Sequence, residues 1–351
     1  MQSARGWVCP CRGIEGMATM RVPVEEMQRE FERVLRGHGF ADEPAQRCAA
    51  IFAENSLVGV ASHGLNRFPG FIDFVRRGLV NPVAQPELVA GFGAWEQWDG
   101  QLGAGPLNAF ACTERAMTLA RQHGMGCVGL RNTNHWMRGG YFGWQAAQAG
   151  FALIAWTNTK PNAPAWGAID PRIGNNPLVL AVPHEAAPVV LDIAMTQFSI
   201  GRMESARRSG ASLPVPGGYD ESGQLSQDPA AILAANRALS IGYWKGSGLA
   251  ILLDLVVALV SGGLTTHEIG QRETEYGVSQ LFLAFDVARA SSAALVNQVA
   301  AEVIADLRTA TPVTPAGDLL YPGERALRTR QQNLEHGIPV EPAIWQQVLA
   351  L

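Results

Sequence analysis

A histidine and an arginine four residues apart are the first candidates for chemistry. His63 lies between Ser62 and Gly64, and Arg67 follows one helical turn later. A guanidinium group can hold a carboxylate through two hydrogen bonds, while a neighbouring imidazole can give a proton to an adjacent oxygen. The pair therefore suits an oxo-acid substrate. The alternative is a histidine at a helix end that bonds only to the backbone, and the residues alone leave both interpretations open.

A second polar group follows a short apolar run. Asn134 and His135 belong to the stretch 132–140, directly after the run 126–130. If that run is a strand, these side chains lie at the edge of a sheet where α/β proteins bind their ligands. Asn175 and Asp192 occupy similar strand-edge positions. The alternative is a set of turns and caps with no ligand.

No standard nucleotide-binding fingerprint is present. A G-x-G-x-x-G or G-x-x-x-x-G-K-[ST] motif would bring a phosphate against the start of a helix. Neither Gly103-Ala104-Gly105 nor Gly246-Ser247-Gly248 is completed by a third glycine, which argues against an ordinary Rossmann or P-loop enzyme. The second of them, beside Lys245, is either a phosphate-binding corner or a plain helix start.

The spacing of the possible ligands disfavours metal chemistry. No pair among the seven histidines has the four-residue spacing with an acid that a metalloprotease helix needs. Cys9 and Cys11 have no second ligand pair nearby, and the five cysteines show no paired framework of the secreted kind. We therefore expect no metal site and a reducing, cytoplasmic environment.

The elements that position these residues begin with a helical segment. The spacing of four apolar residues predicts its first helix: Met27, Phe31, Val34 and Leu35. Two more helices are expected, from about residue 42 and over 68–75, so 20–95 is predicted to be a helical lobe. Helical patterns return at 290–351, and this end is expected to rejoin the lobe. Residues 1–19 are expected to be a disordered tail or an over-extended translation start.

Short β-prone runs alternate with helical ones over 96–289, which is typical of an α/β layer. Strands are predicted at 126–130, 151–157, 178–182, 189–191 and 280–287, and helices at 108–123 and 141–149. Residues 201–240 are predicted to be a loop-rich flap or a long connection.

Composition bounds the class of protein. The 351 residues are 47% apolar and 17% charged, which favours a packed globular chain over a disordered one. A net charge of −4 gives no broad basic field for nucleic acid or an anionic membrane. The longest apolar stretch, 249–260, contains Asp254 and is shorter than the ~20 residues that cross a bilayer. We expect it to be a buried helix, and the partner to be a small molecule, with no nucleic acid and no membrane.

Several motifs, spread over most of the chain, carry a family resemblance. They are Ser62-His63-Gly64-Leu65-Asn66-Arg67-Phe68-Pro69, Asn134-His135-Trp136-Met137-Arg138-Gly139-Gly140, Gly143-Trp144-Gln145-Ala146-Ala147, Trp156-Thr157-Asn158, Asn176-Pro177 and Gly242-Tyr243-Trp244-Lys245-Gly246-Ser247-Gly248. With these motifs the sequence resembles the malate/L-lactate dehydrogenase family, which lacks the Rossmann fingerprint. The likeness covers the chain from about residue 20 to its end.

The resemblance implies a non-Rossmann NAD-binding α/β domain plus a helical lobe built from both chain ends, in a cytoplasmic homodimer. It implies hydride transfer from a nicotinamide dinucleotide to the 2-keto group of a small keto sugar acid. His63 corresponds to the family's proton donor. From the chemistry we infer that Arg67 fixes the substrate carboxylate and that His135, with Asn134, holds the sugar hydroxyls.

The resemblance also implies three groups of cofactor contacts. They fall on Pro188, Val189, Val190, Leu191, Asp192, Ile193 and Ala194, on Trp244 and Lys245, and on Gly323, Glu324 and Arg325. Ala194 stands where the family pattern has a serine, and Gly323-Glu324-Arg325 where it has Gly-His-Glu. NADH is the expected cofactor. NADPH is the alternative, because Arg202, Arg207 and Arg208 could bind its 2′-phosphate.

Other functions fit the same residues. Malate, L-lactate, sulfolactate, ureidoglycolate and cyclic imino acids all have a carboxylate beside a reducible or oxidisable carbon. A catalytically silent protein that binds a nucleotide or a sugar acid is a further alternative. Consumption of NADH with a 2-keto acid would distinguish an enzyme from such a protein.

Overall fold

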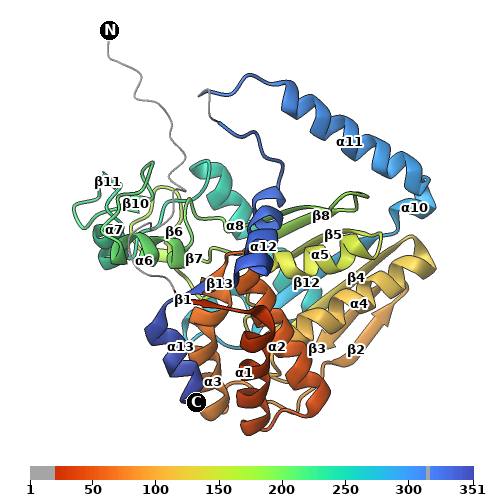
Figure 1. Ribbon diagram of the computed structural model, residues 1–351, viewed down its shortest axis with the longest axis horizontal. Coiled ribbons are helices and arrows are strands. Elements are labelled where there is room, and N and C mark those ends of the chain that lie inside the picture. The colour runs from red at the N-terminus through yellow and green to blue at the C-terminus, as the bar shows by residue number, and fades with distance from the viewer. Residues whose placement is uncertain (1–19, 314–316) are drawn as a thin grey trace.

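The computed structural model describes residues 20–313 and 317–351. A seven-stranded sheet forms the centre of the molecule, and a group of helices packs beside it as a helical lobe (Figure 1). The tail expected at residues 1–19 lies outside the described residues.

The helical lobe is built from the first part of the described chain. Its elements are α1 (Val24–Gly37), α2 (Asp42–Leu57), the short 3-10 helices η1 (Ala61–His63) and η2 (Leu65–Arg67), and α3 (Phe68–Arg76). The four apolar residues that predicted the first helix are all buried in it. The rings of Phe31 and Phe68 stack at 4.1 Å between centroids, and Phe52 meets Phe68 edge-on at 5.1 Å. This aromatic core anchors the chain directly after Arg67.

The two ends of the described chain meet in this lobe. Strand β1 (Met20–Val22) pairs antiparallel with β13 (Ile338–Val340). Helices α12 (Glu324–His336) and α13 (Pro342–Leu349) pack against α2 and against α1 and α3, respectively. In contrast, α10 (Val287–Ala290) and α11 (Ala293–Thr309) lie away from the lobe (Figure 1). The return predicted for 290–351 therefore includes one long helix that does not join it.

The main sheet has the strand order β2-β3-β4-β12-β5-β8-β9. The strands are β2 (Glu87–Phe92), β3 (Trp95–Asp99), β4 (Met125–Thr133), β5 (Ala152–Thr157), β8 (Leu178–Val182), β9 (Val189–Ile193) and β12 (Val278–Phe285). Only the β3–β4 pair is parallel. The sheet thus begins at β2, before the start predicted at residue 96. All five predicted strands are present, with shifted ends.

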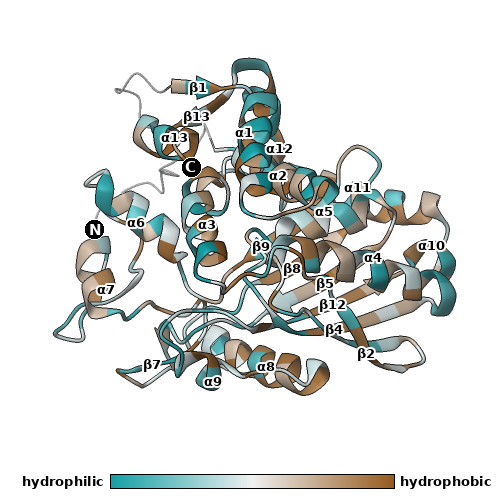
Figure 2. Ribbon diagram, turned by 90° about the horizontal axis from the view of Figure 1, so that it is seen from below, coloured by the Kyte–Doolittle hydropathy of each residue, from teal (hydrophilic) through white to brown (hydrophobic). Residues whose placement is uncertain are grey.

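Helices cover the two faces of the sheet. The helices α4 (Gly105–His123) and α5 (Gly140–Gln148) lie on one face, and α8 (Trp244–Ser261) lies on the other (Figure 2). The helix α9 (Thr266–Gly270) follows α8. Antiparallel neighbours bring the ends of β4 and β5 to the same edge as the starts of β12 and β8.

The helix α8 was predicted to be buried, and only one of its sides is. Ala250 and Val257 are fully buried, whereas Leu252, Leu255 and Leu259 are 54%, 48% and 75% exposed. By length and composition alone the helix could cross a membrane. However, Asp254 in its middle accepts hydrogen bonds from Asn158 Nδ2 at 2.9 Å and from the Thr266 N–H at 2.8 Å. These contacts tie α8 to the sheet edge.

The segment predicted to be a loop-rich flap contains short elements. They are α6 (Ile200–Arg208), the paired strands β10 (Gly218–Tyr219) and β11 (Leu225–Ser226), and α7 (Pro229–Ala235). A second small pair, β6 (Ala163–Pro164) and β7 (Pro171–Ile173), lies between β5 and β8 in the chain. Helix α6 brings this segment to the cavity described next.

Candidate active site

A cavity of about 330 Å³ lies between the helical lobe and the edge of the sheet. It is lined by His63 and Arg67 from the lobe and by His135, which follows β4. The structure thus brings together the three residues predicted to act on the substrate. The other lining residues are Ser62, Asn66, Thr159, Asn162, Asn175, Ser199, Ile200, Gly201, Glu204, Arg208, Glu275 and Ile344.

The backbone around His63 is held by the end of α2. Asn55 Nδ2 donates to the His63 carbonyl at 3.1 Å, and the Leu65 N–H donates to Ser56 Oγ at 2.8 Å. Gly64 lies so close to α2 that an added Cβ would stand 2.1 Å from Ser56 Oγ. A side chain at residue 64 would therefore displace the short helices that carry His63 and Arg67.

The ring of His63 is oriented by its neighbour. Ser62 Oγ and His63 Nδ1 are 3.0 Å apart, which leaves Nε2 for a substrate. Burial lowers the pKa of His63, and the nearby Arg67 and Arg138 lower it further, while the carboxylate of Asp192 acts in the opposite direction. The imidazole therefore holds its proton weakly, as suits a group that must release it.

His135 stacks against His63 with 5.7 Å between ring centroids. Its Nδ1 accepts a hydrogen bond from the Met137 N–H at 2.9 Å, so the neutral ring carries its proton on Nε2. Burial, with Arg67 and His63 nearby, lowers the pKa of His135 well below the usual range. His135 is therefore a neutral hydrogen-bond donor.

The side chain of Asn134 bonds to the backbone of neighbouring loops. Its Nδ2 atom lies 2.9–3.1 Å from three backbone carbonyls, those of Leu79, Leu102 and Gly103. It does not line the cavity. The inference that Asn134 helps His135 to hold sugar hydroxyls is therefore wrong, because the amide nitrogen already links β4 to two neighbouring loops.

Asp192, near the end of β9, contacts a buried arginine and acts electrostatically on His63. Its Oδ2 accepts a hydrogen bond from the Gly140 N–H at 2.7 Å and lies 3.9 Å from Arg138 Nε. Arg138 is buried. This carboxylate is the group that favours the protonated form of His63.

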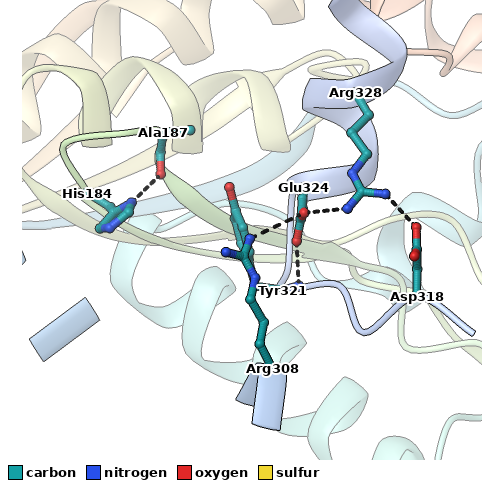
Figure 3. A network of polar contacts seen from close by, with 7 residues as sticks. All are labelled: His184, Ala187, Arg308, Asp318, Tyr321, Glu324 and Arg328. Carbon is teal, nitrogen blue, oxygen red and sulfur yellow. Dashed lines mark hydrogen bonds and ion pairs between the residues drawn. The ribbon is translucent and has the colours of Figure 1, made fainter. Parts of the chain in front are cut away.

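Two of the three predicted cofactor segments touch each other. The Val190 N–H donates to the Pro322 carbonyl at 3.0 Å. At Gly323, where φ is +95°, an added Cβ would stand 3.2 Å from both backbone N and O of Val190. The side chain of Glu324 is already engaged, since its carboxylate faces Arg308 and Arg328 and accepts from the Tyr321 N–H (Figure 3). A ligand at this position would therefore contact the backbone of Glu324 and not its carboxylate.

A second cavity of about 630 Å³ lies beside these segments, between the lobe and α5. Pro188, Arg138, Trp144 and Gln145 line it. Within the described ranges, Trp144 Nε1 and Gln145 Oε1 are buried and have no hydrogen-bond partner. Buried polar atoms normally have a hydrogen-bond partner, so an unpaired donor and an unpaired acceptor beside a cavity indicate a polar ligand. The residues present therefore fit a nicotinamide dinucleotide, and Arg138 in this cavity is near enough to His63 to lower its pKa.

The third predicted segment lies elsewhere in this chain. Trp244 and Lys245 begin α8, on the face of the sheet opposite α5, and Trp244 is 59% exposed. Neither residue lines the two cavities. Of the arginines considered for NADPH, Arg202 and Arg207 are exposed on α6. Arg208 lines the His63 cavity and lies 3.6 Å from Glu341 Oε1.

Sequence reasoning missed several residues of the site. Thr159 and Asn162 follow β5, and their place after an apolar run was a usable signal. Glu275 precedes β12 in a loop with no pattern that would single it out. Residues 20–313 and 317–351 hold no group of three or more His, Cys, Asp or Glu side chains that could hold a metal ion.

The family model and the curated relatives that match this chain point to the same group of enzymes. A family model described as malate/L-lactate dehydrogenase matches residues 22–349. The chain is 42% identical to the 2,3-diketo-L-gulonate reductase of Salmonella newport (strain SL254) over 333 residues, which cover 95% of this chain and 100% of that protein.

Solved structures show the same fold. The malate dehydrogenase of Entamoeba histolytica matches with a TM-score of 0.89 at 24% identity, over 94% of this chain and 96% of its own. The sulfolactate dehydrogenase of Methanocaldococcus jannaschii matches with a TM-score of 0.86 at 25% identity, over 95% of this chain and 98% of its own. The α/β fold with a helical lobe is therefore shared over 94–95% of this chain.

Proposed function

Because this chain belongs to the malate/L-lactate dehydrogenase family, we propose that it reduces the 2-keto group of 2,3-diketo-L-gulonate to give 3-keto-L-gulonate, with NADH as the cofactor. The observation that carries this proposal is the cavity that His63, Arg67 and His135 line together. The 42% identity to a 2,3-diketo-L-gulonate reductase supports this substrate over other 2-keto acids.

The three residues divide the work of reduction. Arg67 binds the carboxylate, which fixes the 2-keto carbon next to it. His135 donates a hydrogen bond from Nε2 to an oxygen of the substrate. Bound NADH supplies the hydride. His63 gives a proton from Nε2 to the oxygen that becomes the hydroxyl, and Asp192 stabilises the imidazolium before this transfer.

The cofactor is assigned to the larger cavity. Pro188 lines this cavity and would hold it, with Trp144 Nε1 and Gln145 Oε1 as hydrogen-bonding atoms. Residues 189–194 and the backbone at 323–325 do not line the cavity, and their contacts rest on the family resemblance alone. The arginines that line this cavity are already paired with carboxylates, Arg138 with Asp192 and Arg330 with Glu54. A 2′-phosphate would therefore find no unpaired arginine in the part of the cavity that the structure describes, which favours NADH over NADPH.

The proposed working form is a cytoplasmic homodimer. The exposed leucines of α8 and the apolar stripe of α11, which consists of Leu295, Val299 and Val303, leave one side of each helix uncovered by the described residues. Exposed apolar faces on neighbouring turns of a helix are typical of protein interfaces. A second copy of this chain is the partner that the family resemblance implies.

The test is oxidation of NADH and, separately, NADPH by the purified protein with 2,3-diketo-L-gulonate, pyruvate, oxaloacetate or a cyclic imino acid. We expect rapid oxidation of NADH with 2,3-diketo-L-gulonate. Activity with another acid alone would change the substrate but keep the chemistry. No oxidation with any of them, together with binding of ligand, would mean a silent binding protein.

A further inference from the structure

One wall of the His63 cavity carries polar side chains that the reduction itself does not use. This polar wall consists of Thr159, Asn162, Asn175 and Glu275, all of which line the cavity beside Arg67. They come from three separate loops at one edge of the sheet, after β5, before β8 and before β12. Their convergence needs an explanation, because a ketone and a carboxylate are already provided for by Arg67, His63 and His135.

The two asparagines of the polar wall present complementary groups. Asn175 Oδ1 accepts from both Asn162 Nδ2 at 2.7 Å and Thr159 Oγ1 at 3.0 Å, so its own Nδ2 is left as a donor. Asn162 Oδ1 is buried and has no hydrogen-bond partner within 20–313 and 317–351. A buried acceptor without a partner is costly in free energy. A hydroxyl group, which both donates and accepts, would satisfy the pair.

Glu275 adds a carboxyl group to the same wall. Its Oε2 accepts a hydrogen bond from the Lys160 N–H at 2.8 Å, which fixes the side chain. Lys160 Nζ in turn donates to the carbonyls of Arg272 and Glu273 at 3.1 and 2.8 Å, so the loop before β12 is held against the end of β5. Oε1 of Glu275 has no partner among the contacts of the described chain, and it can bond a hydroxyl.

We propose that Asn162, Asn175 and Glu275 bind the hydroxyl groups on the carbon chain of the substrate and thereby select polyhydroxylated 2-keto acids over short or unsubstituted ones. This inference rests on the proposed function, and it specifies which end of the substrate lies where. Arg67 attracts a carboxylate, whereas none of the four residues of the polar wall is a cation, so the acid end lies at Arg67 and the hydroxyl-bearing chain at the polar wall. The residues of these loops take the place of Asn134, which the sequence assigned to the sugar hydroxyls together with His135.

Such a wall rejects a chain that lacks hydroxyls. A site built to hydrogen-bond a substrate hydroxyl discriminates strongly against an analogue without it, because buried polar groups then stay unpaired. The same groups are of no benefit to an unsubstituted three- or four-carbon keto acid, which has no chain hydroxyl to pair with them.

The test compares two six-carbon 2-hydroxy acids, L-gulonate and 2-hydroxyhexanoate, which differ only in the hydroxyls of the chain and are not oxidised when NAD is left out. Their dissociation constants are measured by calorimetry with the full chain. We expect the unmodified protein to bind L-gulonate more tightly. Asn162→Leu should weaken L-gulonate about 10- to 100-fold, as for loss of one or two buried hydrogen bonds, and leave 2-hydroxyhexanoate unchanged. Glu275→Gln exchanges a charged hydrogen-bond partner for a neutral one, so it should weaken L-gulonate about fivefold and also leave 2-hydroxyhexanoate unchanged.

The matched control is Asn297→Leu, the same exchange at an asparagine outside the cavity, whose Oδ1 accepts from the Glu185 N–H. It should change neither constant. Equal affinity of the unmodified protein for both acids would overturn the inference. An equal loss of affinity for both acids in Glu275→Gln would also overturn it. This variant keeps the shape of the side chain, so it remains informative if Asn162→Leu does not fold. Failure of the proposed function is a separate result: no NADH oxidation with 2,3-diketo-L-gulonate while the preference for L-gulonate persists.

Discussion

His63 and His135 stack in one cavity, yet their hydrogen bonds give the two rings different protonation behaviour. The Met137 N–H keeps Nδ1 of His135 unprotonated, and burial lowers the pKa of that ring well below the usual range. The pKa of His63 is lowered too, but Asp192 opposes the change. Only His63 therefore has a nearby carboxylate that stabilises a transferable proton.

The role of His63 predicts a specific kinetic defect. His63→Ala removes the proton donor but no atom of the larger cavity, so turnover should fall by about 10²–10⁴-fold while NADH affinity stays nearly constant. Steady-state kinetics and NADH fluorescence titration measure the two quantities. His267→Ala, at an exposed histidine outside the cavity, is the control and should be silent. A near-normal rate in His63→Ala would remove His63 from the proton-donor role.

The pH dependence of the reaction follows from the same group. Reduction requires protonated His63, whose pKa is lowered from 6.5. The kcat/KM for reduction should therefore be highest below that lowered pKa and fall as the pH rises through it, while the reverse oxidation, which needs the neutral ring, should rise. Asp192→Asn removes the carboxylate that favours imidazolium. It should move both midpoints to lower pH.

This second prediction is checked by pH–rate profiles in both directions. The asparagine keeps an oxygen to accept from the Gly140 N–H, so the loop should hold its position. Asp170→Asn, at an exposed aspartate, is the charge-matched control. An unshifted profile in Asp192→Asn would mean that the carboxylate does not act on His63.

At the scale of elements, the site depends on the junction between two short 3-10 helices. η1 ends at His63 and η2 ends at Arg67, and Gly64 joins them against α2. Both catalytic side chains therefore move if this junction moves.

Gly64→Ala tests this dependence. The new Cβ would meet Ser56 Oγ at 2.1 Å and the Phe52 carbonyl at 2.9 Å, so η1 and η2 must shift. We expect a loss of at least about tenfold in kcat/KM, since misplacement of about 1 Å can cost 10²-fold, and a lower Tm. Gly70→Ala is the matched control, because an added Cβ there meets nothing within 4 Å and alanine favours a helix. Equal behaviour of the two variants would contradict the packing argument.

The elements themselves were largely predictable, and their assembly was not. The spacing of apolar residues predicted α1, and short apolar runs predicted β4, β5, β8, β9 and β12. Both patterns are local, because the residues that an element buries must be apolar. The strand order β4-β12-β5 joins residues far apart in the chain, and no local pattern encodes it. For the same reason His63 and Arg67 could be singled out from their spacing, whereas Glu275 became visible only when its loop was seen against β5.

At the scale of the whole molecule, apolar surface remains after the protomer has folded. The prediction that α8 is buried rested on its continuous apolar run, and the sheet accounts for only one of its sides. Leu252, Leu255 and Leu259 are spaced by three and four residues and form one exposed stripe. A buried helix and a helix at a subunit interface have the same composition, so the sequence alone could not separate them.

The stripe on α8 predicts how the proposed dimer can be broken. Leu255→Glu combined with Leu259→Glu places two carboxylates in a face that would be covered by the partner, and burial of unpaired charge opposes association. We expect light scattering after size-exclusion chromatography to show a dimer for the unmodified protein and a monomer for the double variant. Val83→Glu, at a valine that is 73% exposed and belongs to neither α8 nor α11, should remain dimeric. A double variant that stays dimeric would place the interface elsewhere, with the apolar stripe of α11 as the next surface to change, since its Val303 is 66% exposed.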